Sequence, residues 1–293
     1  MNLDLVPNAF ASALVLTGIY TVIALAWVIL IRSTRVFNFA TGQFVLLGAY
    51  VFYWLSVTQR LPLIVSVVLT CLLLAIFGAI VYVSMLRPLT GRGVFAPVIL
   101  TLGLAIVLTR AVGLIWGPNT RTLRKPFTNH SHRLPGNAVI NDYGLTTLAV
   151  SILLFVAILT LLRHTQWGIR VRAAAESPLL ASQSGINIDR AFIAGWSISA
   201  IAAVMAGVSF AYTTVVSASV SDIGLRGIAP ALVGGLDSVA GVLPGAFIVA
   251  SVENIAVLWL GEQARDAAAM MVLLVVLAIR PTGLFGTPEV RRV

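Results

Sequence analysis

The chain has 293 residues, of which 59% are hydrophobic and only 10% are charged, with a formal net charge of +9 and one cysteine. A soluble domain carries about 25% charged residues, so this chain has too few charges to cover a water-facing surface. The mean hydropathy of +1.01 agrees, and together the values exclude an ordinary soluble enzyme, a disordered regulator and a disulfide-rich secreted domain. They indicate a polytopic membrane protein.

The predicted elements are membrane-spanning helices, each of which needs about 20 apolar residues. Six apolar runs reach this length. A seventh run, Val239–Leu260, follows a Gly-rich stretch, and an eighth, Ala264–Ile279, is short. Gly227–Leu236 is only half a span long and is interpreted as a possible re-entrant or broken helix. We therefore expect an all-α bundle of about eight transmembrane helices that forms a single domain over residues 1–293. The six longer runs are Ala9–Ile31, Val36–Val57, Leu61–Leu86, Val94–Trp116, Tyr143–Leu162 and Ala191–Thr214.

The basic residues lie mostly in the gaps between these runs, where they set the orientation in the membrane. This placement argues against nucleic acid as the partner that explains the positive charge. One set of gaps contains eleven basic residues and is predicted to be cytoplasmic: Arg32, Arg35, Arg87, Arg92, Arg163, Arg170, Arg172, Arg190, Arg280, Arg291 and Arg292. The other set contains seven and is predicted to be external, as is the N-terminus: Arg60, Arg121, Arg124, Lys125, Arg133, Arg226 and Arg265. The N-terminus is thus predicted to be external and the C-terminal residues cytoplasmic. A chain whose ends lie on opposite sides crosses the membrane an odd number of times, which favours Gly227–Leu236 as a short crossing.

Two hydrophilic connections differ in kind. Gly117–Asp142 is external and rich in proline, and we expect an irregular loop. Arg163–Arg190 is cytoplasmic and contains helix-forming residues up to Glu176, then Pro178 and a closing Gly185. This order predicts short helices outside the bilayer.

Polar residues open the second predicted span. Asn38, Thr41 and Gln43 lie near its cytoplasmic edge, and Gly42 and Gly48 permit close approach of another backbone. The segment either lines a permeation path or is a capped helix start at the interface.

Small residues recur every four positions along the sixth span, and a second pair opens the seventh. Such stripes let helices pack backbone to backbone, either within this chain or against a partner. The positions are Gly195, Ser199, Ala203, Gly207 and Ala211, followed by Gly241 and Gly245.

Glu253, beside Asn254, lies midway along the seventh span. Ionisable groups inside a membrane are costly and are candidates for function. We therefore place both residues on a hypothetical translocation path with Asn38, Thr41 and Gln43, with packing of Glu253 inside the bundle as the alternative.

Motifs for catalysis or nucleotide binding are not evident. The sole lysine, Lys125, is followed by Pro126, so no Walker A loop is present. His130 and His132 form an HxH pair, for which the sequence offers no further metal ligand. We expect no metal, no cofactor, no catalytic residues and no enzymatic activity.

Three groups of residues resemble a known family over nearly the whole chain. The second span contains Phe37-Asn38-Phe39-Ala40-Thr41-Gly42-Gln43-Phe44-Val45-Leu46-Leu47-Gly48-Ala49-Tyr50. The cytoplasmic loop contains Gly168-Ile169-Arg170-Val171-Arg172-Ala173, Glu176 and Gly185-Ile186, and the C-terminal third contains Gly227, Ala231, Gly234-Gly235, Gly241, Pro244-Gly245-Ala246 and Glu253. In this order they resemble the LivH-type permeases, the inner-membrane subunits of branched-chain amino acid ABC importers.

The resemblance implies a set of partners. The Arg163–Arg190 loop, with Arg170, Arg172, Ala173, Glu176 and Gly185, would dock onto ATPase subunits. ATP would be bound and hydrolysed by two such cytoplasmic subunits and not by this chain. A second, related permease subunit (LivM-like) would pack beside it in the bilayer of the bacterial plasma (inner) membrane. A periplasmic or lipid-anchored binding protein would deliver the substrate.

The function implied is import of leucine, isoleucine and valine. Relatives in the same class import urea or short-chain amides, so those substrates stay open as the alternative. A stand-alone secondary carrier or channel and a membrane scaffold without transport are the competing classes. The few acids within the spans argue against an ion-coupled carrier.

Overall fold

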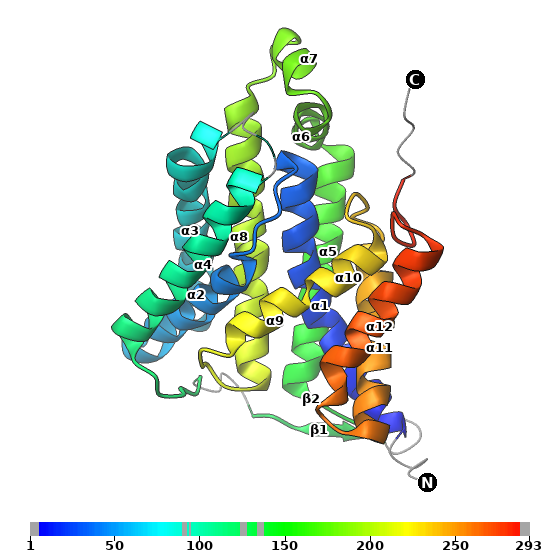
Figure 1. Cartoon of the computed structure of the whole chain (residues 1–293). Helices are drawn as coiled ribbons and strands as arrows, with labels where there is room; N and C mark the ends of the chain where they lie inside the picture. The colour runs from blue at the N-terminus through cyan, green and yellow to red at the C-terminus, as the bar shows by residue number, and fades with distance from the viewer. Residues whose placement is uncertain (1–5, 90–92, 94, 124–127, 134–137, 288–293) are drawn as a thin grey trace. The chain divides into compact units, whose positions relative to one another are not determined.

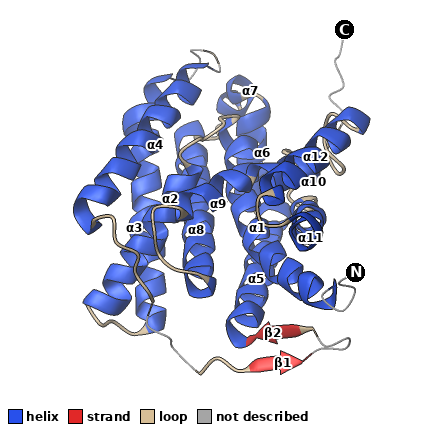
Figure 2. Ribbon diagram, turned by 60° about the horizontal axis from the view of Figure 1, so that its bottom comes forward, coloured by secondary structure: helices blue, strands red, loops and turns tan. Residues whose placement is uncertain are grey.

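The computed structural model describes residues 6–89, 93, 95–123, 128–133 and 138–287 (Figure 1). These residues form helices joined by short connections, with one two-stranded sheet (Figure 2). The elements, including the π-helical turns η2 and η3 and the 3₁₀ turn η4, are in chain order α1 (Val6–Thr34), α2 (Thr41–Tyr53), η2 (Trp54–Thr58), α3 (Leu63–Val81), η3 (Tyr82–Leu86), η4 (Arg87–Leu89), α4 (Phe95–Trp116), β1 (Ser131–Arg133), β2 (Val139–Asn141), α5 (Asp142–His164), α6 (Gln166–Glu176), α7 (Pro178–Gln183), α8 (Ile188–Thr213), α9 (Val220–Arg226), α10 (Ile228–Gly234), α11 (Val242–Leu260) and α12 (Ala264–Ile279).

Six helices of the described chain are long and apolar enough to cross a membrane: α1, α3 with its continuation to Leu89, α4, α5, α8 and α11. The helical membrane bundle is therefore confirmed, because an apolar segment in lipid satisfies its backbone hydrogen bonds internally only as a helix. At 1.5 Å per residue, α2 with 13 residues and α12 with 16 are about 20 and 24 Å long. Both are shorter than a core of about 30 Å, so the count of eight remains a prediction.

The half-length segment is a broken helix. α9 ends at Arg226 and α10 begins at Ile228, and each has seven residues. Seven residues make about 10 Å of helix. α10 alone is therefore shorter than the core of the bilayer, and the short crossing that the charge distribution favoured remains a prediction.

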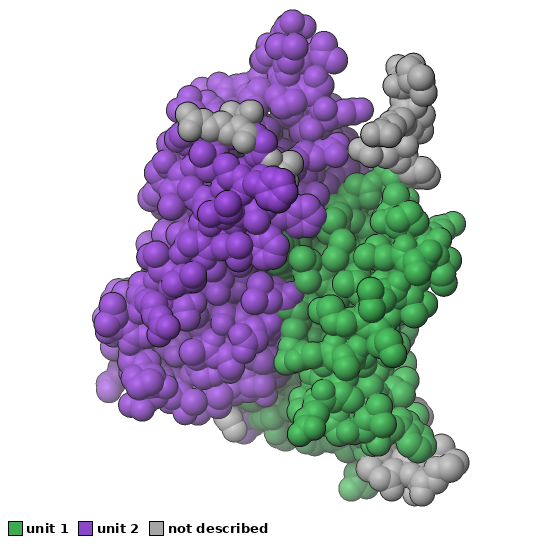
Figure 3. Space-filling view, in the orientation of Figure 1, with its two compact units in different colours: residues 1–28, 129–156, 226–293 green, residues 29–128, 157–225 purple. Residues whose placement is uncertain are grey.

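The chain divides into two compact units, drawn in different colours in Figure 3. Unit 1 contains Met1–Val28, Asn129–Val156 and Arg226–Val293, and unit 2 contains Ile29–Thr128 and Ala157–Leu225. Each unit is described by itself below, and the single domain over residues 1–293 remains a prediction.

In unit 2, α2 and α3 both pack against α8, and α4 packs against α2. Glycines allow these contacts to be close. A methyl group on Gly48 would lie 2.7 Å from Cα of Val204, and one on Gly78 would lie 2.9 Å from the carbonyl oxygen of Trp196. Both distances are below any normal carbon contact, so these two helix crossings require glycine.

The small-residue stripe of α8 also faces helices of this chain. A methyl group on Gly195 would collide with the Ser33 side chain, and one on Gly207 would collide with the carbonyl oxygen of Val45. All members of the stripe are buried: Gly195, Ser199, Ala203, Gly207 and Ala211. Packing within the chain accounts for their size.

In unit 1, α11 packs against α10 and α12. A methyl group on Gly245 would lie 2.5 Å from the Pro230 carbonyl oxygen and 2.6 Å from the Gly234 nitrogen. A methyl group on Gly241 would collide with the carbonyl oxygen of Gly234. The predicted pair Gly241 and Gly245 thus lies against the broken helix.

The segment after α12 is bonded to the connection between α10 and α11. Its backbone N–H groups donate to that connection, which satisfies carbonyls at the end of α10. The pairs are Leu284 N with Val233 O (2.9 Å), Phe285 N with Gly234 O (3.1 Å), and Thr287 N with Asp237 Oδ2 (2.9 Å).

The predicted irregular loop Gly117–Asp142 contains a short hairpin. Ser131–Arg133 pairs antiparallel with Val139–Asn141, so the expectation of irregular backbone is wrong for these residues. Pairing of backbone groups across the hairpin satisfies them where no helix is available.

The HxH pair of this loop contacts a carboxylate that the sequence did not connect with it. His130 Nδ1 lies 3.3 Å from Asp142 Oδ2, and His132 Nε2 lies 2.6 Å from Asp142 Oδ1. Because Asp142 is the first residue of α5, these contacts fix the loop to the start of that helix.

Candidate functional site

Two of the predicted path residues fold the turn before α2. Asn38 Oδ1 accepts a hydrogen bond from Ala40 N (3.0 Å), and the Thr41 hydroxyl donates to the Asn38 carbonyl (2.7 Å). Both side chains are buried. Their polar atoms serve the local turn, which agrees with the helix-start interpretation that the sequence left open.

Gln43 differs from its neighbours. Its Nε2 lies 3.4 Å from Thr109 Oγ1 on α4, and the residue is 8% exposed. Its Oε1 accepts no hydrogen bond from any residue that the structure describes. A buried acceptor without a donor costs about 1–3 kcal/mol. Gln43 therefore has a buried amide oxygen whose hydrogen bonding is unsatisfied within the described residues.

The start of α2 is enclosed by α4 and α9. Thr101 Oγ1 on α4 accepts from Phe39 N (3.3 Å) and lies 3.4 Å from the Phe37 carbonyl oxygen. On another side, a methyl group on Gly42 would collide with the Ser221 carbonyl oxygen of α9. Thr101 could not be singled out from the sequence, because a single threonine in an apolar helix has no distinctive spacing.

In unit 1, Glu253 lies in the middle of α11 and is fully buried. The Tyr20 hydroxyl of α1 donates to its carboxylate and lies 2.8 Å from Oε2 and 3.0 Å from Oε1. Glu253 is therefore surrounded by polar partners within the bundle, as expected for a buried charge that is retained.

Two arginines accompany this carboxylate. Arg265 Nη1 lies 3.8 Å from Glu253 Oε2, while Arg265 Nε donates to Glu262 Oε1 at 2.8 Å. The hydrogen bond from Arg265 holds the pKa of the Glu262 carboxyl below its usual value. Arg226 Nε pairs with Asp266 Oδ1 at 2.9 Å.

We call these residues the charged cluster: Tyr20, Arg226, Glu253, Glu262, Arg265 and Asp266. It contains three carboxylates and two guanidinium groups, which come from the end of α9, the middle of α11, the turn after α11 and the start of α12. The sequence singled out Glu253 alone. An acidic residue stands out within an apolar helix, whereas the residues that contact it from other helices do not. Asn254, predicted beside it, donates from Nδ2 to the Ala250 carbonyl of its own helix (2.8 Å).

The predicted path residues thus form two groups. Asn38, Thr41 and Gln43 lie together in unit 2, and Glu253 and Asn254 lie in unit 1. Their role on a path remains a proposal.

The loop Arg163–Arg190, which the charge distribution predicts to be cytoplasmic, contains the predicted short helices. α6 and α7 are joined at Ser177, whose hydroxyl accepts from Leu180 N (3.4 Å), and Pro178 occupies the first turn of α7. Gly185 ends the hairpin with φ +78°, a conformation that favours glycine. We call α6 and α7 the cytoplasmic hairpin.

The predicted coupling residues fall into two kinds. Arg172 donates to the carbonyl of Leu162 at the end of α5, so this arginine ties α6 to the long helix. Arg170, Glu176 and Gly185 are exposed, and Ala173 is half-buried. Apolar side chains are exposed beside them: Ile169 (56%), Leu179 (68%) and Leu180 (62%).

Comparison with known proteins gives consistent results. A family model described as "Branched-chain amino acid transport system / permease component" matches residues 9–279. The "High-affinity branched-chain amino acid transport system permease protein BraD" of Pseudomonas aeruginosa is 27% identical, with 94% of each chain covered. The protein of the same description named LivH, from Salmonella typhimurium, is 26% identical over 94% of this chain and 93% of its own. A solved chain of "PsaBC from Streptococcus pneumoniae in complex with Fab" has a TM-score of 0.49 at 14% identity, covering 94% of this chain and 91% of that one.

Proposed function

Because this chain belongs to the family of branched-chain amino acid transport permeases, and is therefore a multi-pass inner-membrane protein, we propose that it is the translocating subunit of an ABC importer for leucine, isoleucine and valine. The observation that carries the proposal is the match over residues 9–279, which includes the start of α2, the cytoplasmic hairpin and α11. ATP would be hydrolysed by separate subunits, since this sequence has no Walker A loop.

The cytoplasmic hairpin is the proposed contact with two ATPase subunits. It presents exposed apolar side chains, Leu179 and Leu180, beside exposed charged ones. Such a surface on a hydrophilic loop suits a protein partner. Arg172 ties the hairpin to the end of α5, so a movement of the ATPases would be transmitted to a long helix.

The substrate path would use the polar start of α2 and the charged cluster. Gln43 offers a buried amide oxygen with no partner among the described residues, and Glu253 adds a buried carboxylate. The permease should hold its substrate weakly, because a tightly bound intermediate state would slow release. A LivM-like permease and an external binding protein would complete the importer.

Uptake of labelled leucine tests the class and the substrate together. Uptake should be lost in cells that lack this chain and restored when the gene is returned. In the parent strain, excess isoleucine and valine should compete, whereas urea should not. Competition by urea or a short-chain amide would instead support the alternative substrates. Leucine uptake unchanged in a strain without a second leucine system would contradict the proposal.

Vesicles separate this proposal from a stand-alone carrier. The purified chain alone should not transport leucine, and uptake should require the ATPases, the binding protein and ATP. Leucine transport by the chain alone would contradict the role as an importer subunit.

A further inference from the structure

Asp189 lies in the first turn of α8 and contacts the end of α3 in unit 2. Its Oδ1 accepts a hydrogen bond from the Tyr82 hydroxyl (3.3 Å), and its Oδ2 lies 2.7 Å from Nη2 of Arg87. Tyr82 begins η3 and Arg87 begins η4, the two turns that continue α3. A carboxylate is also favoured near a helix N-terminus. One side chain of α8 therefore holds both turns at the end of α3.

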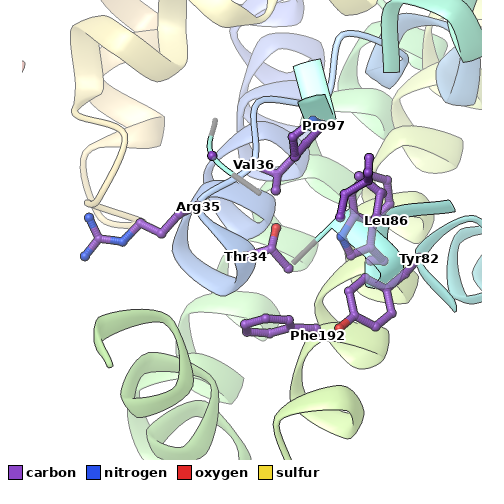
Figure 4. A pocket seen from close by; sticks show the side chains of 10 residues that line it. Thr34, Arg35, Val36, Tyr82, Leu86, Pro97 and Phe192 are labelled. Atoms are coloured by element: carbon purple, nitrogen blue, oxygen red, sulfur yellow. The ribbon is translucent and has the colours of Figure 1, made fainter. Parts of the chain in front are cut away.

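The same two helices are packed together beyond this contact. The rings of Tyr82 and Phe192 meet edge to face, with centroids 5.9 Å apart, at the wall of a cavity of about 270 Å³ (Figure 4). One turn earlier in α3, the close crossing at Gly78 lies against the Trp196 carbonyl. Close-packed protein interiors transmit displacement. A shift of the start of α8 should therefore carry the end of α3 with it.

The link from the cytoplasmic hairpin to Asp189 is short and hydrogen-bonded. Three residues separate α7 from Asn187, the N-cap of α8. Within this link Ile186 N donates to the Ala181 carbonyl (3.0 Å), and Asn187 Oδ1 accepts from Arg190 N (3.0 Å). Both helices of the hairpin also pack against α8. A displacement of the hairpin should therefore reach the first turn of α8 and not be absorbed by the link.

The end of α3 departs from regular α-helix where it meets Asp189. The α-helix ends at Val81, and the π-helical turn Tyr82–Leu86 and a 3₁₀ turn follow it directly. Such turns within long helices are frequent at functional sites and hinges. The contact with Asp189 is thus made at the junction where α3 changes geometry.

We infer that Asp189 is a positioning residue of the transport cycle, which passes a movement of the cytoplasmic hairpin to η3 and through it to α3. The inference rests on the proposed function, in which ATPase subunits contact the hairpin. Arg172 ties the hairpin to the end of α5, so Asp189 would add a second long helix to those that respond. Without this carboxylate the ATPases should still bind and hydrolyse ATP, but less of their movement should reach α3.

Reconstitution of the complete importer in vesicles tests this role. Asp189→Asn keeps the size of the side chain and removes its charge. The amount of leucine transported per ATP hydrolysed should fall about fivefold. Co-purification of the ATPases and the unfolding midpoint of the permease should stay at their wild-type values, because an exposed ion pair contributes little to stability. An unchanged ratio of leucine to ATP would overturn the inference, as would a loss explained by a lower midpoint.

Two hydroxyl groups of η3 provide a matched pair of variants. Tyr82→Phe keeps the ring against Phe192 and removes only the donor to Asp189. Ser84→Ala removes a hydroxyl from the same turn, which donates to the Ile80 carbonyl of its own helix (2.6 Å). The ratio of leucine to ATP should fall for Tyr82→Phe and stay unchanged for Ser84→Ala. Equal falls would mean that any change in η3 has this effect, and would overturn the role of the contact with α8.

The partner arginine tests whether the ion pair itself is used. Arg87→Gln should lower the ratio of leucine to ATP as Asp189→Asn does, and Arg87→Lys should retain most of it. In Arg87→Gln/Asp189→Asn the two losses should not add, because each single change already breaks the pair. Fully additive losses would show that the two residues act separately and would overturn the inference.

A measurement without leucine separates this inference from the proposed substrate. Amide hydrogen exchange of η3 should differ between the nucleotide-free and ATP-bound complexes of the wild-type permease with its ATPases, and this difference should be absent in Asp189→Asn. The same difference in both would overturn the inference. A wild-type complex that shows the difference but transports no leucine would contradict the proposed substrate and still support the role of Asp189.

Discussion

The Tyr20 hydroxyl lies 2.8 and 3.0 Å from the two carboxylate oxygens of Glu253, although 233 residues separate them in the sequence. The contact connects the first long helix to α11 through a fully buried acid. Burying an ionisable residue in a membrane helix is costly in free energy. The hydrogen bond from Tyr20 offsets part of this cost and joins α1 to α11.

Tyr20→Phe should destabilise the protein because it leaves the buried Glu253 carboxylate without its hydroxyl donor. The expected loss in the free energy of unfolding is about 1–3 kcal/mol, measured as a lower unfolding midpoint in detergent. In Tyr20→Phe/Glu253→Gln the two losses should not add. Tyr50→Phe is the control, since Tyr50 is buried and its hydroxyl forms no hydrogen bond with any residue that the structure describes. Strictly additive effects of the first two changes would refute the link.

Gly48→Ala should force α2 away from α8. The new methyl group would lie 2.7 Å from Val204 Cα, and overpacking of this kind costs about 1–3 kcal/mol. Gly103→Ala on α4 is the matched control, because nothing lies within 4 Å of its added methyl group and alanine is the better helix former. The unfolding midpoint should fall for the first variant and stay level or rise for the second. The reverse order would show that this helix crossing is not close.

Gln43→Leu should lower transport without lowering the stability of the protein. Replacing a buried amide that has an unsatisfied oxygen with an apolar group of similar size should leave the free energy of unfolding unchanged or raise it by about 1 kcal/mol. Leucine uptake should nevertheless fall at least about tenfold at equal membrane abundance, which corresponds to about 1.4 kcal/mol. Normal uptake would remove Gln43 from the path. Thr109→Val shows how much of the effect comes from the lost contact with α4.

Leu180→Ser should weaken association with the ATPase subunits without unfolding the permease. The side chain is 62% exposed on α7, so its loss should change stability by less than about 0.5 kcal/mol. Co-purification of the ATPases and leucine uptake should both decrease. Val139→Ser is the control, because Val139 is also an exposed apolar residue but lies on β2. This variant should leave co-purification and uptake unchanged, which distinguishes a docking effect from a general loss of apolar surface.

Glu176→Ala and Arg172→Ala are predicted to differ. Glu176 is exposed, and its change should weaken association and uptake without loosening α6. Arg172 donates to the Leu162 carbonyl, so its loss should also loosen α6 and increase proteolysis of the hairpin. Unchanged association and uptake in both variants would contradict the coupling role of this loop.

The positions of the long helices could be predicted from the sequence because the bilayer imposes one length on every crossing. The predicted run Val94–Trp116 differs from α4 by one residue, and Tyr143–Leu162 differs from α5 by at most two residues at each end. Hydropathy gave less information on Val36–Val57, since α2 begins only at Thr41. The residues before it form a turn through Asn38, and such a turn is as apolar as the helix.

The partners of the site residues could not be predicted in the same way. Glu253 stands out in an apolar run, but Tyr20 is one of many amphipathic residues in α1. No periodicity relates positions 233 residues apart. Similarly, Thr101 and Trp196 carry polar atoms whose importance depends on which helix they face. A single sequence can mark a helix face that packs closely, as the small-residue stripe of α8 does, but it does not identify the residue that this face meets.

The bonds from Leu284 and Phe285 to the end of α10 have a consequence for biosynthesis. The acceptors, the carbonyls of Val233 and Gly234, emerge from the ribosome well before their donors, and Asp237 precedes Thr287 by 50 residues. Until Leu284 and Phe285 have been translated, two carbonyls at the end of α10 lack these donors. The end of α10 therefore reaches its final hydrogen bonding only when the segment after α12 has been made, about 50 residues after α10 itself.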